Sequence, residues 1–123
     1  ISSEIKAGFP SPAADFEELK LSLDHLLVKN REATFYAKAS GNSMIGAGID
    51  DGDILVIDRS LEPRNNAIAV CLIDGEFTVK RIKKDNDEVY LMPENSQYQP
   101  IKIEEENELI IWGIVTYAIK QMK

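Results

Sequence analysis

The sequence predicts a mainly β protein whose antiparallel strands curve into a partly closed barrel. Short apolar stretches rich in β-branched and aromatic residues recur at close spacing along the chain. Two of them are separated only by Asp74-Gly75, the strongest local signal of a β-hairpin. Little of the chain has helical features, so a curved antiparallel sheet is the expected architecture.

The first residues do not resemble a regular element. Residues 1–15 contain Gly8, Pro10 and Pro12 among small side chains, which predicts an extended, flexible arm. Leucines alternate with polar residues over residues 19–23, the period of a half-buried strand. Asp24 is expected to cap a short helical turn that follows.

The rest of the chain, residues 16–123, is expected to form one β-rich domain. A chain of 123 residues is the size of a single domain with a real core. The helical turn should cover residues 25–29. Strands are expected at residues 34–39, 54–57, 67–73, 76–82, 88–92 and 109–119.

Composition excludes several classes of protein. No apolar run has membrane-spanning length, and the first residues lack the basic leader of a signal peptide, so a cytoplasmic protein is expected. A formal net charge of -7 disfavours direct binding to nucleic acid. Cys71 is the only cysteine and His25 the only histidine, so neither an internal disulfide nor a Cys/His zinc cluster is possible. No metal or cofactor is expected.

Ser43 lies in a glycine-rich stretch and is a candidate nucleophile. A serine in such a stretch is often only a turn residue, and a nucleophilic serine needs a base. His25 lies among leucines, where a lone histidine is more often structural. A lysine buried among apolar groups is the other option, and Lys80 shares a strand face with Thr78 and Ile82. The hairpin alone favours an ordinary solvated lysine beside Arg81, so spacing leaves the role of Ser43 open.

Three segments together resemble the LexA/UmuD family of self-cleaving serine peptidases, peptidase family S24. Residues 40–44 (SGNSM) and 48–53 (GIDDGD) resemble its nucleophile motif, and residues 76–81 (EFTVKR) resemble its lysine strand. Residues 6–15 (KAGFPSPAAD) resemble its cleavage segment. The sequence departs from the family's nucleophile motif at Asn42, where many members of the family have Asp.

The resemblance implies a Ser-Lys dyad. Ser43 would attack the bond between Ala7 and Gly8, which places the cleavage site in the arm. Lys80 would serve as general base and then general acid. The backbone N–H groups of Asn42 and Ser43 would form the oxyanion hole. The domain would have the fold of the family's C-terminal domains.

The cleavage segment resembles the mutagenesis branch of the family more than its repressors. That branch implies an SOS-response protein whose self-cleavage is stimulated by the RecA filament. Its product is a homodimer that joins a UmuC-like Y-family DNA polymerase for error-prone translesion synthesis. The alternative is the self-cleavage and dimerisation domain of a LexA-type or phage-type transcriptional repressor.

Overall fold

The computed structural model describes residues 7–8 and 22–123, and the described part is mainly β. Besides the five-residue helix α1 (Leu23–Leu27) it has two short 3-10 turns, η2 (Arg31–Ala33) and η3 (Ile45–Ala47). The strands are β1 (Thr34–Lys38), β2 (Ile54–Asp58), β3 (Ile68–Ile73), β4 (Glu76–Asp85), β5 (Glu88–Met92), β6 (Ile101–Lys102) and β7 (Leu109–Ile119). The predicted fold class is confirmed.

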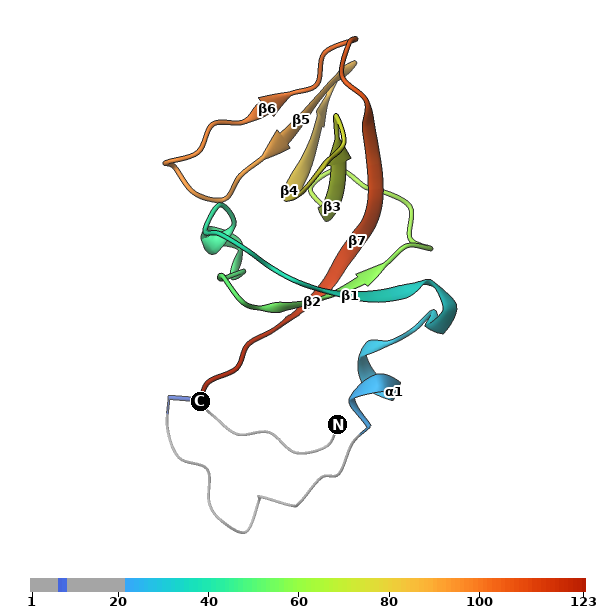
Figure 1. The fold of residues 1–123 in the computed structure, drawn as a ribbon, viewed down its shortest axis with the longest axis vertical. Helices are drawn as coiled ribbons and strands as arrows, with labels where there is room; N and C mark the ends of the chain where they lie inside the picture. The colour runs from blue at the N-terminus through green and yellow to red at the C-terminus, as the bar shows by residue number, and fades with distance from the viewer. Residues whose placement is uncertain (1–6, 9–21) are drawn as a thin grey trace.

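All these strands belong to one antiparallel sheet of order β1-β2-β7-β3-β4-β5-β6. The long strand β7 links its two halves, because one end pairs with β3 and the other with β2. In Figure 1, β1 and β2 run across the molecule, whereas β3 and β4 run along its length. The sheet is thus strongly curved but not closed, since β1 and β6 are its edges.

The β3–β4 hairpin has the turn that its sequence predicts. Asp74 and Gly75 have φ angles of 48° and 85°, so both central residues are left-handed, as in a type I′ turn. Ile73 pairs with Glu76 directly across the turn. This register places Lys80 on β4 opposite Ala69 on β3.

Apolar side chains cover both faces of the curved sheet. Val70 belongs to one core cluster, while its neighbours Ala69 and Cys71 belong to another, because successive residues of a strand point to opposite faces. Leu55 and Ile57 of β2 lie in the same cluster as Val70 and are almost fully buried. This first cluster lies under the loop that carries Ser43.

The N-terminal part of the domain differs from its predicted structure. Leu23 begins helix α1 instead of ending a strand, and residues 19–21 lie outside the described residues. The helix is capped by Ser22, whose hydroxyl accepts the N–H of His25 at 3.5 Å. Asp24 was expected to be the cap, but it lies in the first turn, where its charge favours the positive end of the helix dipole.

The predicted arm lies mostly outside the described residues. Ala7 and Gly8 are described, and both are exposed. Among the described residues, no helix is long and apolar enough to cross a membrane.

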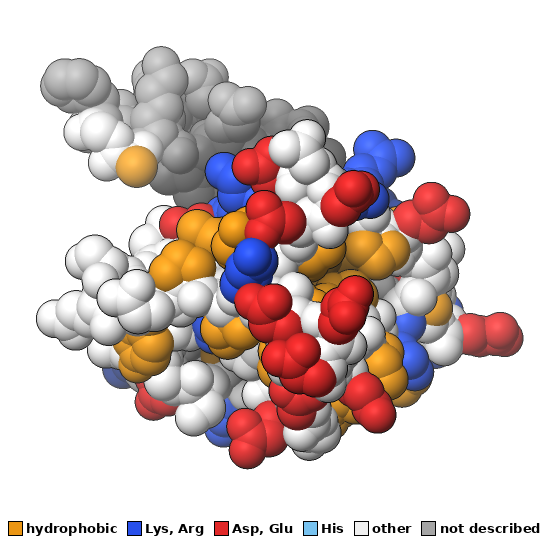
Figure 2. Space-filling view, turned by 90° about the horizontal axis from the view of Figure 1, so that it is seen from above, with side chains coloured by type: hydrophobic (Ala, Val, Ile, Leu, Met, Phe, Trp, Pro, Cys, Tyr) orange, Lys and Arg blue, Asp and Glu red, His pale blue; other side chains and the backbone are white. Residues whose placement is uncertain are grey.

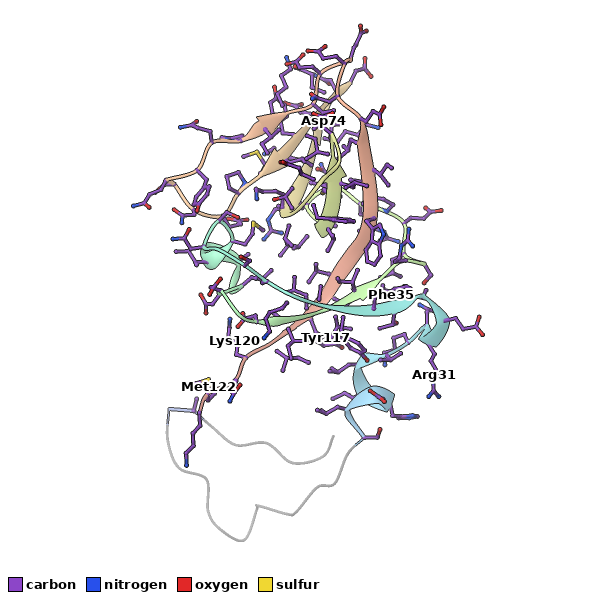
Figure 3. The ribbon with its side chains drawn as sticks, viewed as in Figure 1. Arg31, Phe35, Asp74, Tyr117, Lys120 and Met122 are labelled. Carbon is purple, nitrogen blue, oxygen red and sulfur yellow. The ribbon has the colours of Figure 1, made fainter. Side chains whose placement is uncertain are left out.

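One end of the molecule is acidic. Figure 2 looks onto this end and shows many acidic side chains, and Figure 3 places Asp74 there, far from Tyr117 and Lys120. The carboxylate of Asp74 accepts hydrogen bonds from Asn107 and from the N–H of Glu108, which brings the β6–β7 loop beside the hairpin turn. Exposed acids of this region are Glu76, Glu104, Glu105, Glu106 and Glu108.

Candidate active site

The loop between β1 and β2 carries Ser43 and is anchored at both ends. At its base, the N–H of Ala39 donates to the Asp53 carbonyl at 2.7 Å, and the N–H of Gly52 donates to the Ala39 carbonyl at 2.8 Å. Met44, directly after the serine, is buried with 3% of its surface exposed. Burial of a side chain of this size contributes about 1.5–3 kcal/mol, which holds the loop down while Ser43 itself stays partly exposed.

Glu94 ties the serine loop to the strand that carries the lysine. Its N–H donates to the carbonyl of Ser43 at 2.8 Å, and its own carbonyl accepts the N–H of Gly46 at 2.8 Å. Its carboxylate accepts a hydrogen bond from Arg81 Nε at 2.5 Å. Arg81 is the residue that follows Lys80 on β4. The backbone and side chain of one residue therefore set the position of the loop relative to β4.

Lys120, just after β7, holds the end of the same loop. Its amine donates to Asp50 Oδ2 at 2.9 Å and also to Asp53 Oδ2. The Lys120 hydrogen bond lowers the pKa of Asp53, and a hydrogen bond from the Asp50 N–H adds to the effect. Figure 3 shows Lys120 close to the C-terminal end of the chain. This contact is long-range, and no local pattern in the sequence signals it.

The structure brings Ser43 and Lys80 together. Lys80 Nζ lies 3.1 Å from Ser43 Oγ, although 37 residues separate them in sequence. The amine also donates to Thr78 Oγ1 at 2.6 Å and to the Val79 carbonyl at 3.1 Å. Three oxygens therefore fix its position beside the hydroxyl.

The environment of Lys80 favours the neutral amine. Only 8% of its surface is exposed, and burial lowers the pKa of the Lys80 amine. Within residues 7–8 and 22–123, no carboxylate forms an ion pair with it. A neutral amine in contact with a hydroxyl can accept its proton, so the pair has the chemistry of a nucleophile and its base.

Backbone N–H groups next to the hydroxyl are available to a ligand. Among the hydrogen bonds of the described residues, none uses the N–H of Asn42, Ser43 or Met44 as donor. Gly41, just before them, does have a partner, since its N–H donates to Asp51 Oδ1 at 2.8 Å. Free N–H groups beside a nucleophile are the usual means of stabilising an oxyanion.

A groove with a cavity of about 480 Å³ runs past Ser43. Its floor contains core side chains of the sheet, and Phe77 and Trp112 line it as well. The two rings meet edge to face with centroids 6.2 Å apart. The other lining residues are Ala37, Lys38, Ala39, Ser40, Gly41, Met44, Ile49, Leu55, Ile57, Val70, Thr78 and Val79. The groove is largely apolar and has room for a short peptide segment beside the serine.

Other candidate residues lie elsewhere. His25 is exposed on α1 and does not line the groove. Cys71 is fully buried, and burial raises the pKa of its thiol to about 11, so it is a core residue and not a nucleophile. Ala7 and Gly8 are exposed and do not line the groove in this structure.

The fold and the site define a β-sheet protein with a serine and a buried lysine paired at the edge of a peptide-sized groove. Residues 1–116 match the family model described as Peptidase S24-like, and the chain belongs to this family, the LexA/UmuD family. Family membership supports a serine peptidase.

Relatives match over most of the chain. It is 42% identical over 116 residues to Protein MucA of Salmonella typhimurium, covering 94% of this chain and 79% of the relative. It is 37% identical over 119 residues to Protein ImpA of Shigella flexneri, covering 96% and 80%. LexA repressor 1 of Geobacter sulfurreducens is 35% identical over 103 residues, covering 84% of this chain and 50% of the repressor.

Proposed function

We propose that this chain is a UmuD-like SOS mutagenesis protein that cuts its own arm between Ala7 and Gly8. The observation that carries the proposal is the 3.1 Å contact between Ser43 Oγ and the buried amine of Lys80 at the side of an apolar groove. Exposure of both residues of the scissile bond agrees with a segment that can enter this groove.

The cleavage proceeds in two steps. Ser43 Oγ attacks the Ala7 carbonyl carbon while its proton passes to Lys80 Nζ, and the N–H groups of Asn42 and Ser43 stabilise the oxyanion. Lys80 then donates this proton to the nitrogen of Gly8, the C–N bond breaks, and an ester joins Ala7 to Ser43. Water, deprotonated by Lys80, attacks the ester and releases the Ala7 carboxylate, and the proton returns from Lys80 to Ser43 Oγ.

Tethering and a conformational equilibrium account for regulated cleavage. The arm is part of the same chain, so its effective concentration at the groove is high and weak catalysis suffices. Cleavage then depends on how often the arm occupies the groove. A partner that binds the docked state more tightly shifts this population, and the RecA filament is the proposed partner.

The product is proposed to be a cytoplasmic homodimer that binds a UmuC-like Y-family polymerase. Large exposed apolar side chains on the face of β1, β2 and β7 offer a surface for a second copy: Tyr36, Ile54, Tyr117 and Ile119. The acidic end and the net charge of -7 argue that the partners, not this chain, contact DNA. The alternative, a repressor's self-cleavage domain, is supported by the match to LexA repressor 1.

Self-cleavage is tested by incubating the purified chain at alkaline pH, or with RecA on single-stranded DNA at neutral pH. Mass spectrometry is expected to find the two fragments that result from hydrolysis between Ala7 and Gly8. The Ser43→Ala variant is expected to stay intact under both conditions. An intact wild-type chain, or fragments that also form from Ser43→Ala, would contradict the proposal.

A bulky side chain in the groove should slow self-cleavage without inactivating the serine. Ala37 is exposed on β1 and lines the groove, so Ala37→Trp is expected to slow self-cleavage about tenfold or more by excluding the arm. A small fluorophosphonate should still label Ser43 at close to the wild-type rate. Equal loss of cleavage and labelling would show that the substitution damages the dyad instead of the groove.

A further inference from the structure

Asn42 is held by two side chains of the segment that follows β5. Tyr98 donates its hydroxyl to Asn42 Oδ1 at 2.6 Å, and Asn95 Nδ2 donates to the Asn42 carbonyl at 2.9 Å. The residue before the serine is thus fixed at both its side chain and its backbone. Neither Asn95 nor Tyr98 lines the groove or contacts Lys80.

The segment that makes these contacts is itself well fixed. Asn95 Oδ1 accepts the N–H of Gln97 at 2.9 Å, and the Asn95 carbonyl accepts the N–H of Tyr98 at 3.0 Å. These bonds form a tight Asx-type turn that sets the direction of the Asn95 amide and of the Tyr98 ring. Glu94 adjoins this turn and is bound to the Ser43 carbonyl.

Peptide planarity carries these contacts into the site. The carbonyl of Asn42 and the N–H of Ser43 belong to one planar trans peptide and point in opposite directions. The Asn95 bond to that carbonyl therefore fixes the direction of the Ser43 N–H. The Glu94 bond to the Ser43 carbonyl fixes the N–H of Met44 in the same way.

We propose that Asn95 and Tyr98 are positioning residues that orient the Asn42–Ser43 peptide, so that the Ser43 N–H faces the oxyanion of the cleavage reaction. This inference rests on the proposed function. It also accounts for the residue type at position 42, because Asn and Asp both present an acceptor oxygen to the Tyr98 hydroxyl.

The test compares variants that remove one hydrogen bond each. Tyr98→Phe loses the hydroxyl, and Asn95→Asp keeps the Oδ1 acceptor but cannot donate to Asn42. Each is expected to lower the plateau rate of self-cleavage about three- to tenfold. The pH midpoint of Tyr98→Phe should not move, because this substitution adds no charge and Tyr98 does not contact Lys80. Gln97→Ala, a neighbouring exposed position, is the matched control and should cleave as the wild type does.

A second comparison tests the hydrogen bond between Tyr98 and Asn42 alone. Asn42→Leu is expected to slow cleavage, Asn42→Asp to slow it much less, and Tyr98→Phe to add little to Asn42→Leu. Phosphonylation of Ser43 should fall together with self-cleavage, since in both reactions the reagent or substrate oxygen that gains negative charge would lie in the same oxyanion hole.

The outcomes separate the two proposals. If the wild type fails to cleave itself, the proposed function is wrong. If the wild type cleaves itself and both Tyr98→Phe and Asn95→Asp cleave as fast as the wild type does, the positioning role is wrong. A shifted pH midpoint in Tyr98→Phe would mean that the segment acts on Lys80, and a lower Tm with an unchanged rate would mean a purely structural role. Either result overturns the inference.

Discussion

Replacing Lys80 by arginine is expected to abolish self-cleavage at every pH, whereas the wild-type rate should rise about tenfold per pH unit until Lys80 is mostly neutral. Burial lowers the pKa of Lys80, so the midpoint should lie below the ordinary lysine value of 10.5. Arginine keeps its charge throughout this range and cannot accept the serine proton. The rate is measured by the loss of intact chain on gels between neutral and strongly alkaline pH.

Two results would contradict this assignment. One is a wild-type rate that is flat over the same range. The other is measurable cleavage by Lys80→Arg that still depends on Ser43. Lys80→Met serves as a control for shape, because it keeps the linear side chain without any proton acceptor, and it should be as inactive as Lys80→Arg.

The same pKa shift has a consequence for stability. Lys80 titrates near 10.5 when unfolded and lower when folded, so between these two values the unfolded chain binds more protons. The free energy of unfolding should therefore rise with pH through this window as the burial penalty disappears. Below the folded pKa the penalty is constant. Lys80→Met should lack this rise and should be more stable than the wild type at neutral pH, which urea denaturation at several pH values can measure.

Local patterns in the sequence predicted most of the sheet. β5 and β7 have the predicted bounds, and the Asp74-Gly75 turn is as expected. β7 has eleven residues, enough to show a clear pattern, and the hairpin carries strong turn chemistry. β6 was missed because two residues, Ile101–Lys102, are too few to show a period, and they form a strand only by pairing with β5.

The candidate site was only partly predictable. Resemblance indicated Ser43 and Lys80, and Thr78 was expected on the same strand face as the lysine. Glu94 and Lys120 were not predicted, because each reaches the serine loop from a distant part of the chain through hydrogen bonds that exist only after folding. The helix cap was wrong for a simpler reason, since Ser22 and Asp24 are both good caps and only the register of α1 distinguishes them.

Gly46→Ala is expected to impair both stability and self-cleavage, because no room exists for a methyl group at this position. A Cβ at Gly46 would lie 2.6 Å from the carbonyl oxygen of Glu94, which is backbone and cannot rotate away as a side chain would. The same carbonyl accepts the Gly46 N–H at 2.8 Å, so relief of the clash breaks the bond that joins the two segments. The free energy of unfolding should fall by about 1–3 kcal/mol.

The effect on cleavage follows from the same displacement. Glu94 also binds the Ser43 carbonyl, so moving it shifts the serine relative to Lys80, and the rate should fall about tenfold or more even where the chain is fully folded. Gly48→Asn is the matched control. Gly48 has a φ of 83° and no atom within 4 Å of a Cβ, and Asn tolerates this left-handed backbone better than other residues. Denaturation curves and cleavage rates should show a larger loss of stability and of rate for Gly46→Ala than for Gly48→Asn. Equal losses for both variants would show that the close approach to Glu94 does not position the serine.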